Sequence, residues 1–183
     1  MNQINPRSSL RVGVAGPSRW RGCSGSASQT LALGRAIASL ARGDDLIALV
    51  GELGAGKTQL VRGLVQGLGI DPGRVSSPTF VLMQQYTRAD GGLAVWHIDA
   101  YRLGHGDDGE SIGWGSDLFG NAVTVIEWAD RLAGPLPADR LDIELLHAGV
   151  DQRHVAVKAW GSWRDRMGRL CLAWDGVVAG SNV

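Results

Sequence analysis

The feature that most constrains this chain is the segment Gly51–Thr58, which reads GELGAGKT and fits the pattern G-x-x-x-x-G-K-[ST]. It follows Leu46–Val50, a short apolar run typical of strands in parallel sheets, and precedes apolar residues at helical spacing that end near Gly69. Glycine lets backbone N–H groups approach phosphate oxygens, and the helix N-terminus adds partial positive charge. We therefore expect an α/β chain with a P-loop NTPase-like three-layer fold, in which helices flank a mixed central sheet.

Composition makes an accidental match to this pattern rare. The chain has 27 Gly but only two Lys, Lys57 and Lys158, against sixteen Arg. These frequencies give about 0.004 accidental matches over the whole chain. Lysine is a compact charge on a flexible stem, which suits phosphate groups. We expect Lys57 to reach the β- and γ-phosphates of a nucleotide and the Thr58 hydroxyl to be a ligand of Mg²⁺.

Such a site also needs an acid at the end of a neighbouring strand, to hold Mg²⁺ directly or through water. Two acids fit this requirement. Glu127 ends the apolar run Val123–Ile126, and Asp99 ends the run 94–98. The pattern of residues leaves both open. The nucleotide is expected to be ATP, because neither lysine lies in the Asn-Lys-x-Asp context with which GTPases of this class read guanine.

The remainder of the chain suggests one domain with two tails. Residues 1–25 are rich in Arg, Ser and Gly without periodicity, which predicts a disordered tail. Residues 26–163 are expected to form the P-loop domain, and residues 164–183 a C-terminal tail whose structure we do not assign. Alternating segments around the turn 89–92 and between residues 141 and 160 predict two β-hairpins.

Charge and cysteine content bound the function further. The formal net charge is zero, although residues 1–43 hold six Arg and no acid. This balance argues against a dedicated nucleic-acid binder. No run reaches the roughly 18 apolar residues of a membrane span, and Cys23 and Cys171 form no disulfide framework. We expect a cytoplasmic protein, with organellar import through the acid-free leader as the alternative.

Four blocks, in order and spacing, resemble one family. They are Gly51–Thr58, Ser77–Phe80 (SPTF), His97–Leu103 (HIDAYRL) and Ile126–Trp128 (IEW), the last followed by ADRL at 129–132. Together they are similar to the TsaE family, formerly YjeE, which comprises small P-loop ATPases of bacterial tRNA threonylcarbamoyladenosine synthesis. The similarity extends from about residue 26 to about residue 163.

The resemblance implies roles for individual residues. Thr58 and Glu127 would ligate Mg²⁺, Asp99 would orient the attacking water, and Lys57 would contact the phosphates. Thr79 would contact the γ-phosphate region from a switch-like segment. Residues implied in ATP binding are Gly54, Ala55, Gly56, Lys57, Thr58, Gln59 and Thr79, with Thr30 and Arg153 nearby.

The resemblance also implies a function. The chain would hydrolyse ATP slowly by itself and faster with its partners TsaB and TsaD, which it would reset between rounds of modification. Contact with tRNA would be indirect, through that complex. Two alternatives stay open: a P-loop kinase that phosphorylates a small metabolite, and a nucleotide-sensing adaptor without turnover.

Overall fold

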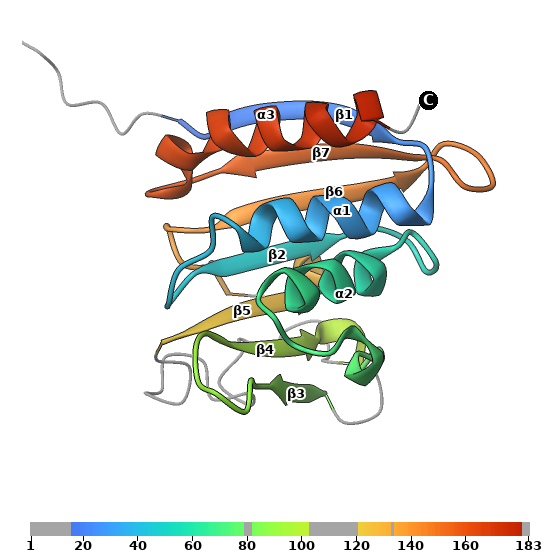
Figure 1. The fold of residues 1–183 in the computed structure, drawn as a ribbon. Helices are drawn as coiled ribbons and strands as arrows, with labels where there is room; N and C mark the ends of the chain where they lie inside the picture. Colours follow the sequence, from blue (N-terminus) through green and yellow to red (C-terminus); the bar gives the residue numbers. More distant parts are fainter. Residues whose placement is uncertain (1–15, 79–81, 103–120, 133, 181–183) are drawn as a thin grey trace, which may run out of the picture.

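The computed structural model describes residues 16–78, 82–102, 121–132 and 134–180. They form one seven-stranded sheet in the order β1-β7-β6-β2-β5-β4-β3 (Figure 1). The strands are β1 (Ser18–Ser24), β2 (Leu46–Val50), β3 (Met83–Tyr86), β4 (Ala94–Asp99), β5 (Ala122–Glu127), β6 (Leu141–His147) and β7 (Arg153–Ala159). The helices are α1 (Ala27–Ala38), α2 (Lys57–Gly67) and α3 (Trp163–Gly180).

Parallel pairing is confined to the centre of the sheet. β2 pairs in parallel with β5 and β6, and β4 pairs in parallel with β5. The outer pairs are antiparallel, and two of them are the predicted hairpins, β3–β4 and β6–β7. The α/β fold with a mixed central sheet, which the sequence predicted, is therefore confirmed. β5 is buried at every position, which explains why its sequence, AVTVIE, shows no polar alternation.

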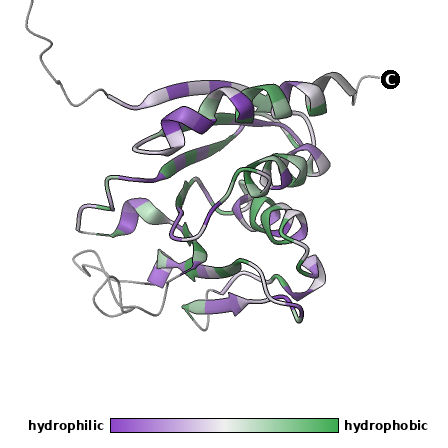
Figure 2. Ribbon diagram, turned by 60° about the vertical axis from the view of Figure 1, so that its left-hand side comes forward, coloured by the Kyte–Doolittle hydropathy of each residue, from purple (hydrophilic) through white to green (hydrophobic). Residues whose placement is uncertain are grey.

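The three helices lie on one face of the sheet (Figures 1 and 2). α1 and α2 pack closely because glycines face each other's backbone. A Cβ on Gly63 would lie 1.9 Å from the Leu31 carbonyl oxygen, and one on Gly34 would lie 2.1 Å from that of Leu60. Among the described residues, the opposite face carries only short 3₁₀ turns, η2 (Ala100–Arg102) and η5 (Ala129–Arg131), over a second, smaller apolar core.

The structure corrects the expected domain boundaries at both ends. Seven residues of the expected N-terminal tail form β1, which pairs with β7 along its whole length. The unassigned C-terminal tail contains α3, an 18-residue helix. The two additions pack on each other through Trp20 and Trp174, whose rings meet edge to face at 6.2 Å. Residues 1–15 lie outside the described residues.

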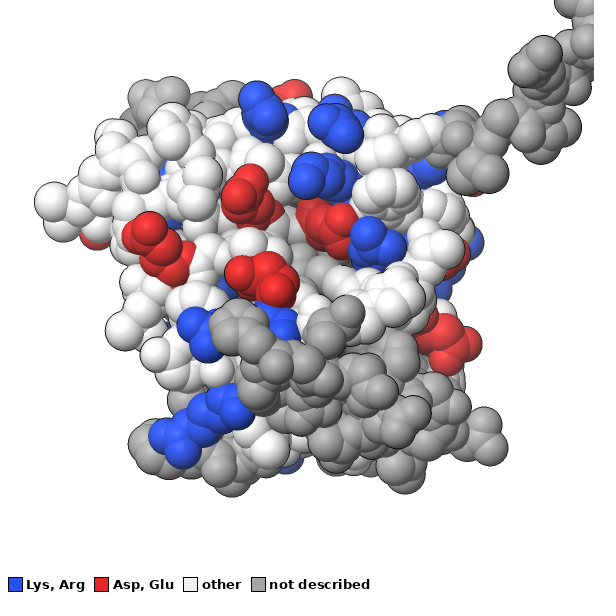
Figure 3. All heavy atoms as spheres, turned by 180° about the vertical axis from the view of Figure 1, so that it is seen from behind, with Lys and Arg blue, Asp and Glu red and all other residues white. Residues whose placement is uncertain are grey.

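The helix-free face of the sheet carries charges of both signs (Figure 3). Arg19, Arg21 and Lys158 lie on β1 and β7 and are exposed, whereas Asp142 and Glu144 lie on the neighbouring strand, β6. A surface that grips nucleic acid usually presents a basic patch or stripe without interleaved acids. The described residues of this face instead place basic and acidic side chains next to each other. In the part of the chain that the structure describes, no helix is long and apolar enough to cross a membrane.

Candidate nucleotide-binding site

The GELGAGKT segment forms the turn between β2 and α2, as the sequence predicted. Gly54 and Gly56 have backbone φ angles of +77° and +104°, which residues with a Cβ rarely adopt. A Cβ on Gly51 would lie 2.3 Å from the Leu145 carbonyl oxygen. Gly56 is also the N-cap of α2, so the unpaired N–H groups of the first turn start at the end of the loop. This arrangement suits an anion.

Lys57 is buried at the start of α2, with 4% of its surface exposed. Its Nζ donates hydrogen bonds to the carbonyl oxygens of Gly51 (2.6 Å) and Glu52 (2.9 Å) and lies 3.7 Å from the centre of the Trp128 ring. Burial lowers the pKa of Lys57, and the negative charges of nearby carboxylates, chiefly Glu127, partly oppose that shift. Within the described residues the ammonium forms no ion pair shorter than 4 Å.

The structure brings the two expected metal ligands together. The Thr58 hydroxyl donates a hydrogen bond of 2.9 Å to Glu127 Oε1, and Glu127 is 97% buried at the end of β5. A hydroxyl and a carboxylate oxygen are ligands that Mg²⁺ accepts, and Mg²⁺ commonly keeps several waters. The described residues contain no cluster of three or more His, Cys, Asp or Glu side chains that could hold a metal ion.

Asp99 lies at the same edge of the sheet, directly opposite Glu127 in the β4–β5 register. One carboxylate oxygen accepts a hydrogen bond from the Ser77 hydroxyl at 3.1 Å, and the other accepts one from the Tyr101 backbone N–H at 2.9 Å. These contacts hold the carboxylate between the SPTF segment and the turn η2. Thr79, the other residue expected from that segment, lies outside the described residues.

Thr30 and Arg153 also lie beside the P-loop, where they contact its backbone from outside the pocket. A Cβ on Gly56 would lie 3.5 Å from Thr30 Cγ2 and 3.7 Å from Arg153 Nε. Arg153 Nε donates to the Ala55 carbonyl oxygen at 3.1 Å, and the Thr30 hydroxyl is hydrogen bonded to that of Ser24 at 2.8 Å. Neither side chain lines the pocket described next.

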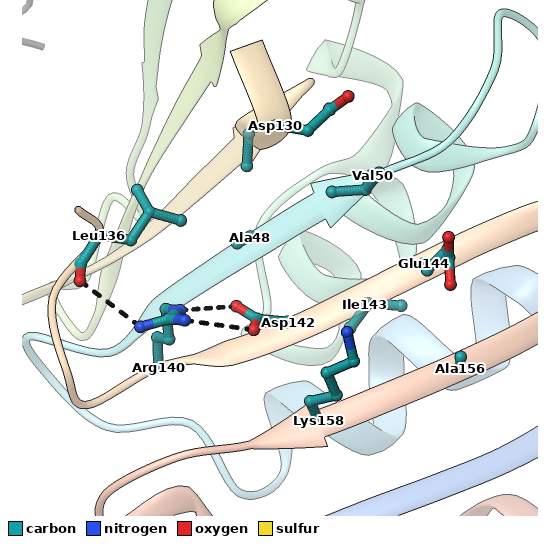
Figure 4. A pocket seen from close by; sticks show the side chains of 11 residues that line it. Ala48, Val50, Asp130, Leu136, Arg140, Asp142, Ile143, Glu144, Ala156 and Lys158 are labelled. Carbon is teal, nitrogen blue, oxygen red and sulfur yellow. Dashed lines mark hydrogen bonds and ion pairs between the residues drawn. The ribbon is translucent and has the colours of Figure 1, made fainter. Parts of the chain in front are cut away.

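A pocket of about 310 Å³ opens over the P-loop. Seven of the residues expected in the site line it, and four others complete the lining, so that the full set is Leu53, Gly54, Ala55, Gly56, Lys57, Thr58, Gln59, Ser77, Tyr101, Glu127 and Trp128. A second cavity, of about 220 Å³, lies on the helix-free face beside the Arg140–Asp142 ion pair (Figure 4). That cavity contains none of the expected site residues.

Sequence reasoning missed the aromatic wall of the pocket. Trp128 adopts a left-handed backbone conformation, with φ of 60°, directly after Glu127, and its ring centre lies 5.0 Å from that of Tyr101. A non-glycine residue in this conformation is uncommon and persists where the surroundings fix it. The sequence offered one hint of this role, namely that Trp128 directly follows Glu127, the acid at the end of the strand.

The sequence also gave no role to a histidine behind the acids. His97 is fully buried, and its Nε2 lies 2.9 Å from Glu127 Oε1, while its Nδ1 lies 3.3 Å from the Tyr86 hydroxyl. Burial raises the pKa of Tyr86, so its phenol keeps its proton at neutral pH. The strand period of two places His97 and Asp99 on the same face of β4, but the contact with Glu127 depends on the register between β4 and β5.

A glycine loop between a buried strand and a helix, with its lysine, hydroxyl and acid converging at the edge of the sheet, defines an α/β protein of the P-loop type. Comparison with known sequences narrows this class to one family. The family described as threonylcarbamoyl adenosine biosynthesis protein TsaE matches residues 24–155. The chain belongs to the TsaE family.

Individual relatives agree with this assignment. The tRNA threonylcarbamoyladenosine biosynthesis protein TsaE of Bacillus subtilis is 37% identical over 134 residues, which cover 73% of this chain and 82% of the relative. The protein of the same name from Streptomyces coelicolor is 42% identical over 70% of this chain and 89% of its own length. The crystal structure of Bacillus subtilis YdiB is similar, with a TM-score of 0.66 and 28% identity over 87% of this chain and 95% of that one.

Proposed function

We propose that this protein binds ATP with Mg²⁺ and hydrolyses it as a component of tRNA threonylcarbamoyladenosine biosynthesis. The observation that carries the proposal is the hydrogen bond of 2.9 Å between Thr58 and Glu127 beside the buried ammonium of Lys57. In P-loop NTPases a hydroxyl from the loop and an acid from a neighbouring strand share the metal, and a lysine contacts the phosphates. The names of the relatives support the biosynthetic process.

Each residue then has a defined task. The N–H groups of the P-loop and of the first turn of α2 hold the phosphates, and the Lys57 ammonium compensates their charge. Thr58 and Glu127 hold Mg²⁺, which when bound neutralises charge that develops on the phosphate oxygens. Asp99, at the same edge as Glu127, orients the attacking water. Most of the catalytic effect in such reactions comes from positioning and electrostatics.

In this proposal the chain hydrolyses ATP as one component of a protein complex. The chain would act with TsaB and TsaD in the cytoplasm and reset them between rounds, while tRNA contacts the complex and not this chain by itself. The mixed charge of the helix-free face supports indirect contact with tRNA, because it offers no uniformly basic surface.

The experiment follows the γ-phosphate of ATP. Purified protein is incubated with ATP and Mg²⁺, with and without TsaB and TsaD, and free phosphate and threonylcarbamoyladenosine in tRNA are measured together. We expect partner-stimulated phosphate release that Glu127→Gln abolishes along with sustained tRNA modification. Transfer of phosphate to a metabolite would instead indicate a kinase. Full modification by the Glu127→Gln protein without phosphate release would indicate a nucleotide-sensing adaptor.

A further inference from the structure

A buried line of hydrogen bonds runs away from the pocket behind Glu127. It starts at Thr58 on α2, passes Glu127 on β5 and His97 on β4, and ends at Tyr86 on β3. The successive contacts measure 2.9, 2.9 and 3.3 Å. His97 and Tyr86 are both fully buried, so no solvent competes for these contacts. His97 and Tyr86 do not line the pocket over the P-loop, yet hydrogen bonds connect them to the proposed ligands of Mg²⁺.

The direction of the hydrogen bond between His97 and Glu127 follows from hydrogen-bonding chemistry. An ionised carboxylate can only accept hydrogen bonds, so beside ionised Glu127 the Nε2 atom of His97 carries a proton and donates a hydrogen bond. Nδ1 faces the Tyr86 hydroxyl. The same hydroxyl lies 3.1 Å from the Gln84 side-chain oxygen and 3.4 Å from the Ser76 carbonyl oxygen, and its single proton can serve one of these three acceptors at a time. Tyr86 thus contacts the ring nitrogen opposite the one that contacts Glu127, which favours one orientation of the imidazole ring.

We propose that His97, oriented by Tyr86, is a positioning residue for the Mg²⁺–ATP site. This inference rests on the proposed function. Both of these hydrogen bonds fall on Glu127 Oε1, so Thr58 and His97 together fix the side chain that would hold Mg²⁺. Residues that hold a metal ligand from behind set its orientation, and their loss typically costs 10–100-fold in metal affinity or activity. Without His97, Glu127 would lose a donor in a buried site and turn toward the Lys57 ammonium, whose charge it already stabilises.

The test separates metal binding from nucleotide binding in the full chain. Binding of a fluorescent ATP analogue is measured in EDTA and during a Mg²⁺ titration. His97→Leu is expected to raise the Mg²⁺ concentration for half-saturation about 10–100-fold and to leave affinity in EDTA unchanged. His97→Gln should recover most of the loss, because the glutamine amide can donate from nearly the position of Nε2. Tyr86→Phe should show a smaller rise, and His154→Leu, at an exposed histidine on β7, none.

Three results would overturn the proposal: an unchanged Mg²⁺ requirement in His97→Leu, an equal loss of affinity in EDTA, or failure of His97→Gln to restore what His97→Leu loses. Should His97→Leu not fold, nitrogen-15 spectra of the wild-type imidazole decide the matter. A proton on Nε2 of His97 is expected, and a bare Nε2 would refute the inference. A wild-type protein without any Mg²⁺-dependent ATP binding would instead refute the proposed function, and the spectra would still report the direction of the hydrogen bond.

Discussion

Two regions of this protein bury charge in different ways. On the outer flank, where α3 covers the sheet, Arg166 donates from both terminal nitrogens to Asp45 at 2.6 and 2.7 Å, and both side chains are more than 90% buried. At the P-loop, Lys57 is equally buried, and among the described residues its ammonium contacts two carbonyl oxygens and an indole ring. The charges of the flank thus pair with each other, whereas the described residues place no carboxylate within ion-pair distance of Lys57. Stability and function are therefore separable by mutation.

The largest effect is expected at the P-loop. Lys57→Ala should weaken ATP binding by at least about 100-fold, because the buried charge that faces the phosphates is lost. The chain supplies a matched control, since Lys158 is its other lysine and is exposed on β7. Isothermal titration with ATP and Mg²⁺ should show full binding by Lys158→Ala. Comparable loss in both variants would mean that Lys57 has no special role.

The flank should respond in the opposite manner. Trp174 is 2% exposed and packs against Trp20, so Trp174→Ala should lower the free energy of unfolding by about 3–5 kcal/mol. ATP affinity of the protein that remains folded should not change. Leu172, on the same helix but 74% exposed, gives the control, and Leu172→Ala should unfold like the wild type in urea. A change in ATP affinity in Trp174→Ala would contradict the separation of the two regions.

The parts of the molecule that the sequence predicted are those in which local pattern decides the structure. β2 follows from LIALV and the P-loop from its glycines and Lys57. The positions of Asp99 and Glu127 could be predicted because each ends an apolar run, and parallel strands bring their carboxyl ends to one edge. The side chains that touch these acids could not be predicted. The contact of His97 with Glu127 depends on the register between β4 and β5.

The flank was missed for two different reasons. β1 contains arginines and a glycine, and its pairing with β7 joins segments far apart in the chain, which no local pattern indicates. α3 did leave a readable signal. Its buried residues Trp163, Met167, Leu170 and Trp174 recur at helical spacing, and this periodicity alone would have predicted the helix.

Breaking the buried ion pair tests whether the flank depends on its internal charge partners. Arg166→Met leaves Asp45 buried with its backbone partner Arg42 N–H but without a counter-charge, and it should cost about 3 kcal/mol of stability. The matched control is Arg88→Ala, which removes the exposed pair between Arg88 and Asp90 and should leave the unfolding midpoint unchanged. Urea denaturation measures both. Equal midpoints for the two variants would contradict the view that the flank is held by its buried pair.

The smallest effect is expected where the two regions meet, at the start of α1. The Ser26 hydroxyl accepts a hydrogen bond from the Gln29 backbone N–H at 3.2 Å and is the N-cap. Ser26→Ala should cost about 1 kcal/mol, and Ser28→Ala, at an exposed helical position, much less. Because Thr30 in the next turn lies beside Gly56 of the P-loop, fraying there would also weaken ATP binding slightly. Urea denaturation and ATP titration of both variants measure the two effects. A loss of stability in Ser26→Ala without any change in ATP affinity would mean that the N-cap of α1 stabilises the fold but does not affect the P-loop.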